Sequence, residues 1–257
     1  MWQQTQSWIA AQANPDGGWG YLPGQPSSAE PTLLALACSD AGDPAWLDRA
    51  ELGWAALMGP SLLRRRDPGR ARALVDAVLA LQGDPGGISA GTYDASIPGW
   101  AWVDGTFSWV EPTAWGVLGL RAQDQAEHPR CVQGTALLVD RQCSDGGWNS
   151  GNPDVLGADL PGYLYAAGLC ALALPPGDAV ERALEFAEGV REAPSTLNLS
   201  YAILARLRHG RDPSVELELL RKRQVEGAFS GRVDRNALAV LALQAAEIGR
   251  SPLLLEA

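Results

Sequence analysis

The chain alternates two kinds of apolar segment, and this alternation limits the folds that are open to it. The segment 178–191 carries apolar residues on one face and charged residues on the others, which is typical of a helix with one side in water. The segments 110–122 and 233–248 are apolar on every face, which is typical of helices covered on both sides. Two helical layers satisfy both patterns, with an inner ring around a central space and an outer ring facing water.

These patterns predict an all-α fold, in which five to six helix pairs form an α/α barrel, or toroid, within one domain over residues 1–257. The outer, amphipathic helices are expected near residues 2–12, 44–57, 69–82, 128–142, 178–191 and 213–224. The inner, apolar helices are expected near residues 30–41, 110–122, 159–173, 194–208 and 233–248. One inner helix is missing from this count and is expected around 59–68 or within 83–109. The segment from Ser251 begins like a further outer helix.

A loop that begins with glutamine recurs between the two layers. Its copies are QANPDGGW from Gln12, QGDPGGI from Gln82, QCSDGGW from Gln142 and QVEGAF from Gln224. The glycines allow a tight turn, and the glutamine can hydrogen-bond loop backbone or the start of the next helix. We therefore expect these loops to stabilise the fold, with the final aromatic ring covering the boundary between the layers.

The segment Gln142 to Trp148 matches the Q-x-x-x-G-x-W repeat, so the chain resembles the squalene–hopene and oxidosqualene cyclases. The segment GGWGYLPGQPSSAEPTLLAL is similar to the G-G-F…P-G-Q…A-P-T segment of protein prenyltransferase β-subunits, which share the α/α toroid. This resemblance implies a terpene cyclase-like protein that acts on an apolar isoprenoid. Because full triterpene cyclases place the site between two such barrels, a second subunit could complete the site here.

Glu111, in FSWVEPTAWGVLGL, is the leading candidate for a catalytic acid. Class II terpene cyclases protonate an alkene or epoxide with the middle Asp of D-x-D-D-T, and alignment on the following Thr-Ala puts Glu111 in its place. Trp109 and Pro112 stand where the other two carboxylates would be. An acidic residue before proline is also typical of a helix start, where it meets the helix dipole favourably. The second copy AEPTLLALAC, with Glu30, favours this structural interpretation.

Asp104 and Asp159 are further candidate catalytic residues, again by resemblance. VDGTFSW is similar to the prenyltransferase segment that supplies an Asp and a Cys to zinc, with Asp104 in the Asp place and Thr106 in the Cys place. ADLPGYLYAAGL, which is similar to the segment with the zinc-binding histidine, offers Asp159 and Tyr163 but no histidine. Since threonine does not replace a thiolate ligand, neither a metal site nor a cofactor is predicted.

The candidate substrate-binding residues form two groups. Polar residues at predicted inner-helix starts would meet Glu111 at one mouth of the barrel, although each could be a helix cap: Glu30, Asp159, Asn198, Asp234 and Asn236. Tyr163, from the segment with Asp159, is a further candidate. Five aromatic residues could stabilise a carbocation or fill the gap left by the missing helix: Trp100, Trp102, Phe107, Trp109 and Trp115. The run Arg64 to Arg66 could bind a diphosphate, but a solvated loop is the commoner role of a charge run.

Composition narrows the partners and the location. A net charge of −10 disfavours nucleic acid, whose phosphates are bound by clusters of Lys and Arg. No apolar run reaches the ~20 residues of a spanning helix, although peripheral membrane contact stays open. The start of the sequence lacks the features of a secretory signal, so a cytoplasmic location is expected.

Two other functions stay open. One is a noncatalytic toroid that binds an isoprenoid or a protein in its lumen, which the loss of the acidic and zinc-binding motifs favours. The other, against which the Gln–Trp loops argue, is a carbohydrate-active α/α-barrel enzyme that uses a carboxylate pair and tryptophan platforms.

Overall fold

The computed structural model describes residues 1–84, 91–189 and 194–255. These residues form helices and one short hairpin, so the predicted all-α class is confirmed. The α-helices are α1 (Trp2–Ala11), α2 (Ala29–Cys38), α3 (Gly59–Leu62), α4 (Pro68–Ala80), α5 (Val110–Arg121), α6 (Pro129–Asp140), α7 (Leu164–Ala173), α8 (Asp178–Gly189), α9 (Thr196–Arg208), α10 (Ser214–Arg221) and α11 (Val233–Ile248). Two 3-10 helices, η1 (Pro44–Asp48) and η2 (Gly53–Met58), and the antiparallel strands β1 (Asp154–Val155) and β2 (Ala158–Asp159) complete the set.

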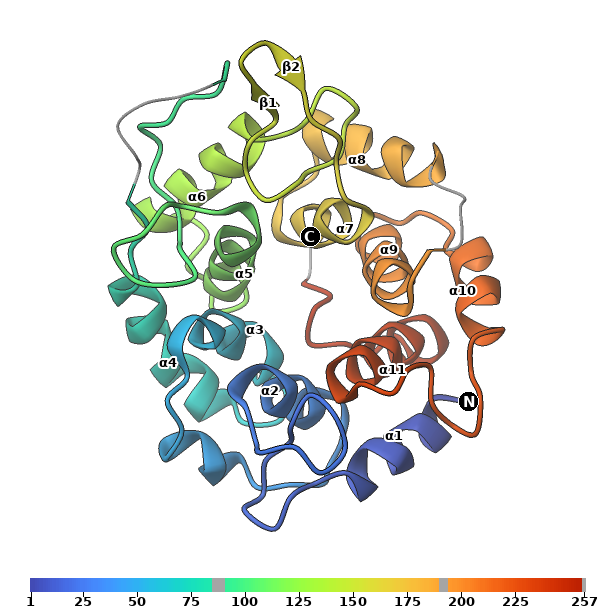
Figure 1. The fold of residues 1–257 in the computed structure, drawn as a ribbon. Coiled ribbons are helices and arrows are strands. Elements are labelled where there is room, and N and C mark those ends of the chain that lie inside the picture. Colours follow the sequence, from blue (N-terminus) through green and yellow to red (C-terminus); the bar gives the residue numbers. More distant parts are fainter. Residues whose placement is uncertain (85–90, 190–193, 256–257) are drawn as a thin grey trace.

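The helices lie in two layers around the centre of the molecule. Figure 1 shows α2, α5, α7, α9 and α11 around the centre, with α1, α4, α6, α8 and α10 outside them. Each inner helix packs on the next in the order α2, α3, α5, α7, α9, α11, and α11 packs on α2 again. The inner helices α5, α7 and α11 are buried over most of their length, as their all-round apolar sequences require.

The missing inner helix is short and irregular. η2 and α3 pack on both α2 and α5, so they occupy the inner place between these helices. The predicted outer α-helix over 44–57 is therefore wrong. Asp43 caps only the short η1, and Gly53, with φ of +52°, lies where the chain turns inward. The residues that follow, Ala55 to Met58, are buried.

Each of three repeat loops is fixed to the outer helix before it by a buried tryptophan. The indole Nε1 of Trp19 donates to Ile9 O (2.8 Å), and that of Trp148 donates to Leu138 O (2.6 Å). Trp100 Nε1 donates in the same way to Val78 O (2.8 Å). Trp100 is thus the tryptophan of the Gln82 loop, displaced along the chain by an insertion. Ile88, the last residue of the QGDPGGI copy and the one in the place of the aromatic residue, lies outside the described residues.

Two of the four loop glutamines, Gln142 and Gln224, hydrogen-bond the start of the next outer helix, whereas Gln12 Nε2 donates to Trp8 O within α1 (3.2 Å). Gln142 Nε2 donates to Ala179 O at the start of α8 (2.8 Å). Gln224 Nε2 donates to Met1 O (3.1 Å) and to Thr5 Oγ1 (2.8 Å), so it makes the corresponding link from α10 to α1. Because α1 also packs on α11, the first helix completes the outer layer beside the last ones.

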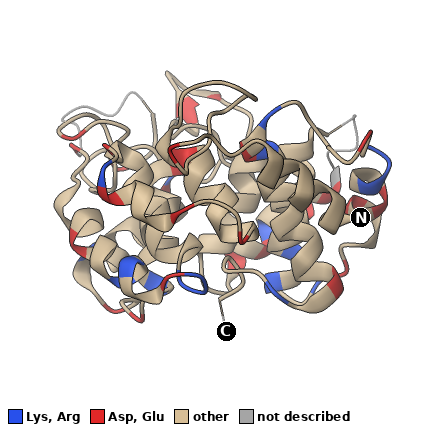
Figure 2. Ribbon diagram, turned by 90° about the horizontal axis from the view of Figure 1, so that it is seen from below, with Lys and Arg blue, Asp and Glu red and all other residues tan. Residues whose placement is uncertain are grey.

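Residues 251–255 form no helix, contrary to the expected further outer helix. This segment lies at the centre in Figure 1 and, in Figure 2, at the end opposite the β1–β2 hairpin. Arg64 holds it by donating to Pro252 O (2.7 Å) and Leu254 O (2.6 Å). Arg66 donates instead to carbonyls between α2 and η1, such as Asp40 O (3.0 Å). These two arginines therefore bind backbone rather than forming a solvated loop.

Among the described helices, none combines the length and the apolarity needed to cross a bilayer.

Candidate functional site

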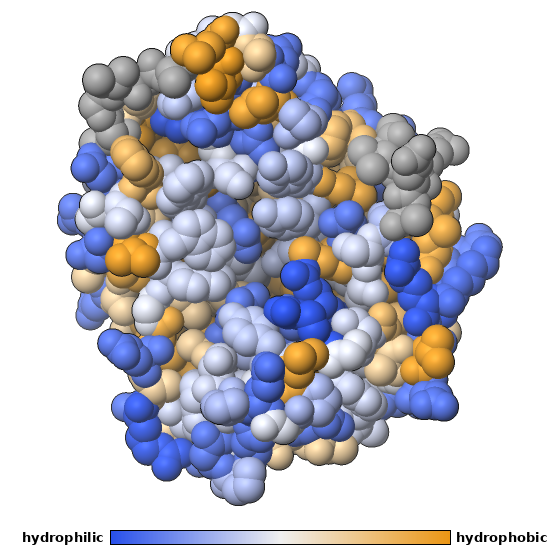
Figure 3. All heavy atoms as spheres, in the orientation of Figure 1, coloured by the Kyte–Doolittle hydropathy of each residue, from blue (hydrophilic) through white to orange (hydrophobic). Residues whose placement is uncertain are grey.

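A cavity of about 440 Å³ opens at the end of the ring where the inner helices begin. Figure 3 shows this face, which is hollowed at its centre beside a strongly hydrophilic patch. The cavity is lined by Tyr21, Leu22, Gln25, Glu30, Trp54, Trp102, Glu111, Arg232 and Arg235. The predicted convergence of inner-helix starts on one mouth thus holds for α2, α5 and α11.

Glu30 and Glu111 reach the cavity because α2 and α5 begin in the same way. Each is the second residue of its helix and precedes a buried proline, in the sequences AEPT and VEPT. The threonine that follows, Thr32 in α2 and Thr113 in α5, is buried and hydrogen-bonds the backbone of the tryptophan loop. This anchoring fixes both helix starts and leaves the glutamates at the mouth.

The side chain of Glu111 is half-buried in the cavity wall. Its pKa is raised to about 7, first by burial and second by the charge of Glu30, against the opposing effect of Arg235. Within the described residues, this carboxyl makes no hydrogen bond. It is therefore a carboxylic acid that keeps much of its proton near neutral pH.

Glu30 differs from Glu111 because it has a hydrogen-bond donor. Tyr21 Oη donates to Glu30 Oε2 at 2.6 Å. Burial still raises the pKa of Glu30, and Tyr21, Arg235 and Arg232 pull it down. The pKa of Tyr21 is raised by burial first and then by Glu30.

Two arginines share one buried aspartate at the start of α11. Arg232 donates from Nε to Asp234 Oδ1 (3.0 Å) and from Nη2 to Oδ2 (2.9 Å). Arg235 Nε lies 3.3 Å from Asp234 Oδ2, and the Asp234 side chain is only 2% exposed. The guanidinium of Arg232 also lies over the Tyr21 ring, 4.8 Å from its centroid.

Aromatic residues form the apolar part of the site. Trp54 and Trp102 meet edge to face, with ring centroids 4.5 Å apart and planes at 78°. Tyr165 in α7 and Tyr201 in α9 stand close enough for the Glu111 charge to act on them. Burial is the main cause that raises the pKa of Tyr165 to about 12 and that of Tyr201 well above its usual range, and Glu111 is the second cause for both.

Of the predicted site residues, the structure brings Glu111, Glu30 and Trp102 together in the cavity, with Asp234 behind its arginines. Asp104 and Asp159 lie elsewhere. Asp104 is in an exposed loop and accepts from Gln82 N (3.0 Å), and Asp159, exposed on β2, accepts from Ser144 Oγ (2.8 Å). Both make hydrogen bonds typical of loops.

The other predicted binding residues occupy structural or surface positions. Trp100 and Trp115 are fully in the core, and Asn236 is buried, with Oδ1 accepting from Phe229 N (2.7 Å). Phe107 is largely exposed. Three others lie at or near helix starts: Trp109, Tyr163 and Asn198.

The sequence interpretation missed Tyr21, Trp54, Arg232 and Arg235. The arginines stand at the start of α11, on either side of the predicted Asp234. Trp54 lies in the stretch that was predicted to be an outer helix. The structural role of Trp100 could have been predicted, because Trp100 precedes Thr113 by the same spacing as Trp19 precedes Thr32.

Within the described part of the chain, no three His, Cys, Asp or Glu side chains gather in a group that could hold a metal ion. The four cysteines, Cys38, Cys131, Cys143 and Cys170, are free and buried.

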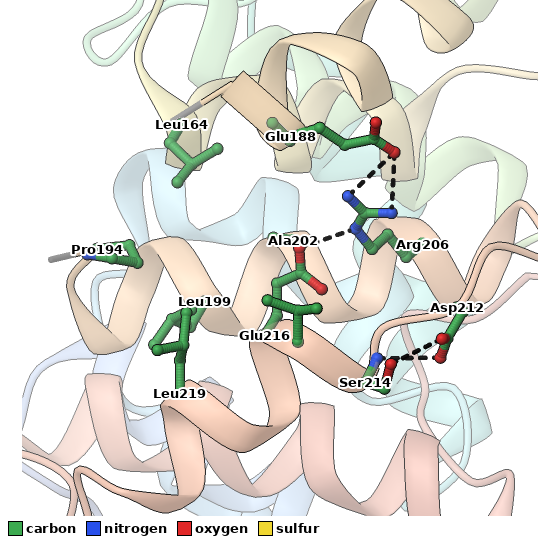
Figure 4. Close-up of a pocket in the computed structure, with 12 residues that line it drawn as sticks. Leu164, Glu188, Pro194, Leu199, Ala202, Arg206, Asp212, Ser214, Glu216 and Leu219 are labelled. Atoms are coloured by element: carbon green, nitrogen blue, oxygen red, sulfur yellow. Dashed lines mark hydrogen bonds and ion pairs between the residues drawn. The ribbon is translucent and has the colours of Figure 1, made fainter. Parts of the chain in front are cut away.

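A second cavity, of about 300 Å³, lies between α8, α9 and α10 (Figure 4). Its charged groups already have partners: Arg206 pairs with Glu216 (3.0 Å) and with Glu188 (3.5 Å), and Asp212 accepts from Ser214 N (3.0 Å). Apolar side chains such as Leu199 and Leu219 line the remainder. None of the residues predicted from the sequence lines this cavity, so the cavity at the mouth is the candidate site.

No known family matches the chain, and no curated protein matches it. A solved structure of a UGL variant with dGlcA-Glc-Rha-Glc is similar to it at 14% sequence identity. The match covers 95% of this chain and 67% of that chain, with a TM-score of 0.28. A similarity at this level carries no argument about function.

Proposed function

We propose that the cavity at the mouth is a general-acid site, in which Glu111 donates a proton to an isoprenoid and so initiates its cyclisation. The observation that carries this proposal is the environment of Glu111. Its side chain is half-buried, its carboxyl makes no hydrogen bond within the described residues, and it lies in one cavity with Trp54 and Trp102. A general acid works best when its pKa is near the working pH, and the pKa of Glu111 is about 7.

This acidity favours one type of substrate. An epoxide oxygen is much more basic than the carbon of an alkene, so a weak acid such as Glu111 suits an isoprenoid epoxide better than a plain alkene. The proton would go to the epoxide oxygen, the carbon–oxygen bond would break, and a double bond of the chain would attack the carbon. The faces of Trp54 and Trp102 would stabilise the resulting cation.

We also propose that the fold is the α/α toroid of terpene cyclases and prenyltransferase β-subunits. Two features support it. The inner helices pack in a closed order from α2 to α11 and back, and the loops with Trp19, Trp100 and Trp148 repeat one hydrogen bond to the preceding outer helix.

The test is a product assay. The protein is incubated with squalene, oxidosqualene, farnesyl diphosphate and geranylgeranyl diphosphate, and the extracts are analysed by gas chromatography and mass spectrometry beside Glu111→Gln. We expect a cyclised product from the wild type that is lost in the variant, with a rate that declines as the pH rises through 7. A product that persists in Glu111→Gln would show that this carboxyl is not the acid.

A second candidate function is supported by Glu30, which lines the same cavity as Glu111 beside the two tryptophans. Paired carboxyl groups with aromatic platforms are the equipment of glycoside hydrolysis. Cleavage of a polysaccharide panel, lost in both Glu30→Gln and Glu111→Gln, would favour this function. Isoprenoid retained through purification without any turnover would instead favour a noncatalytic binding protein.

A further inference from the structure

The mouth of the ring contains two arginines, but their hydrogen-bonding capacity is used differently. Arg232 is already bidentate, since both its Nε and its Nη2 donate to Asp234. Arg235 reaches the same aspartate only through Nε, at 3.3 Å. Its two terminal nitrogens make no hydrogen bond within residues 1–84, 91–189 and 194–255, although Arg235 lines the cavity. The site therefore presents one available pair of guanidinium donors.

A single guanidinium pair matches a single planar anion. The two terminal nitrogens of arginine donate in parallel to the two oxygens of a carboxylate. A diphosphate could accept hydrogen bonds from the same two nitrogens of Arg235. Its higher negative charge would, however, be repelled by Glu30, Glu111 and Asp234. The charges of the cavity thus favour a monoanion.

The remainder of the cavity wall beside these arginines is apolar in part. Trp54 and Trp102 form their edge-to-face pair there, and Leu22 lines the rim. A ligand that fits both parts has a carboxylate at one end and a hydrocarbon body at the other.

We propose that the cavity at the mouth binds an apolar carboxylic acid, whose carboxylate pairs with Arg235 and whose hydrocarbon part lies against Trp54 and Trp102. The inference rests on the proposed function in that the same cavity would hold the molecule on which Glu111 acts. It adds that this molecule is an acid.

The protonation of Glu111 should control this binding. The titratable or charged groups around it come from every neighbouring inner helix and the first loop: Tyr21, Glu30, Tyr165, Cys170, Tyr201, Arg232, Asp234 and Arg235. Protonated Glu111 leaves Arg235 free to pair with the ligand, whereas ionised Glu111 competes with it. With a pKa of about 7 for Glu111, the affinity should fall about tenfold between pH 6 and pH 8.

The experiment is isothermal titration calorimetry of the full chain with three probes that share one hydrocarbon chain: farnesoic acid, farnesol and farnesyl diphosphate. We expect farnesoic acid to bind most tightly, and at least tenfold more weakly to Arg235→Gln. Arg235→Lys, which keeps the charge but loses the paired donors, should also weaken it several-fold. Arg211→Gln is the matched control, because Arg211 is an exposed arginine paired with Glu181 on the outer layer. Thermal melts confirm that each variant is folded.

Three outcomes would overturn the inference: farnesol binding as tightly as farnesoic acid, farnesyl diphosphate binding more tightly, or equal affinities in Arg235→Gln and Arg211→Gln. Glu111→Gln should bind farnesoic acid at pH 8 as tightly as the wild type does at pH 6. The product assay tests the proposed chemistry separately. If no product forms but farnesoic acid still binds in an Arg235-dependent way, the carboxylate inference holds and the proposed chemistry does not. Cyclisation of a neutral isoprenoid with no binding of the acid would refute only the carboxylate inference.

Discussion

Glu111 is subject to two opposing effects at the start of α5. An ionised carboxylate in the first turn of a helix gains roughly 0.3–1 kcal/mol from the helix dipole. Burial and the neighbouring Glu30 raise its pKa from 4.5 to about 7, which corresponds to roughly 3 kcal/mol against the ionised form. Desolvation therefore outweighs the dipole, and a residue whose position is typical of a helix start has the chemistry of a proton donor.

This balance predicts how stability depends on pH. The folded state holds the Glu111 proton up to a pKa of about 7, whereas the unfolded chain loses it near 4.5, so folding stability contributed by this group falls as the pH rises between these values. Glu111→Gln removes the ionisation. We expect the variant to exceed the wild type by about 3 kcal/mol at pH 8 and to differ little at pH 4.5, as measured by urea unfolding.

Glu185→Gln provides the matched control for this prediction. Glu185 is exposed on α8, so its replacement should leave the unfolding free energy within about 0.5 kcal/mol at both pH values. If Glu111→Gln changed stability equally at pH 4.5 and pH 8, the carboxyl would not be the buried acid described here.

At the scale of the elements, one threonine in each of two inner helices ties helix to loop. Thr32 Oγ1 accepts from Trp19 N (2.9 Å) and donates to Trp19 O (3.2 Å). Thr113 Oγ1 accepts from Trp100 N (2.9 Å) and lies 3.4 Å from Trp100 O in the equivalent contact. Each hydroxyl thereby satisfies backbone groups that are buried beside a tryptophan.

Replacement of either threonine by valine keeps the shape and removes the hydroxyl. Because a buried backbone N–H would lose its acceptor, we expect Thr32→Val and Thr113→Val each to cost about 1–3 kcal/mol of unfolding free energy in urea. The two costs should be similar, since the contacts are equivalent. A neutral Thr113→Val beside a costly Thr32→Val would mean that the Trp100 loop is not held like the Trp19 loop.

The elements that the sequence predicted are those whose pattern is regular. The inner helices α2, α5 and α11 were expected within about three residues of their ends, because a helix that is apolar on every face must be covered on both sides. The start of α7 was expected at 159, five residues before its observed start at Leu164. The η2–α3 segment was predicted only in part. α3 falls within 59–68, one of the two places expected for the missing inner helix, but η2 was assigned to an outer helix because the buried residues from Ala55 to Leu62 span a helix too short for a periodic pattern.

The candidate site was predictable only in part, for a similar reason. Glu30 and Glu111 were found because the E-P-T sequence marks both helix starts. Arg232 and Arg235 carry no such mark, and their meeting with the glutamates depends on α11 packing against α2, which is a long-range contact. The pairing of Trp54 with Trp102 likewise joins two segments whose approach no local pattern encodes.

At the scale of the whole molecule, the two ends of the ring differ. The cavity opens at the end where the inner helices begin, and the segment from Ser251 to Leu255 lies at the other end (Figure 2). Arg64 from the stretch after α3 and Arg208 from α9 both donate to its carbonyls, the latter to Leu255 O (3.1 Å). The segment thus joins parts of the chain that are far apart in sequence.

Leu253 is the residue in this segment whose contribution can be isolated, because its side chain is fully buried in the hydrophobic core. Leu253→Ala should therefore lower the unfolding free energy by about 2–5 kcal/mol in urea, through lost burial and the cavity left behind. Leu156, at 88% exposure on the hairpin at the opposite end, is the matched leucine, and Leu156→Ala should stay within about 0.5 kcal/mol of the wild type. Equal effects of the two substitutions would mean that the Leu253 side chain does not pack into the core.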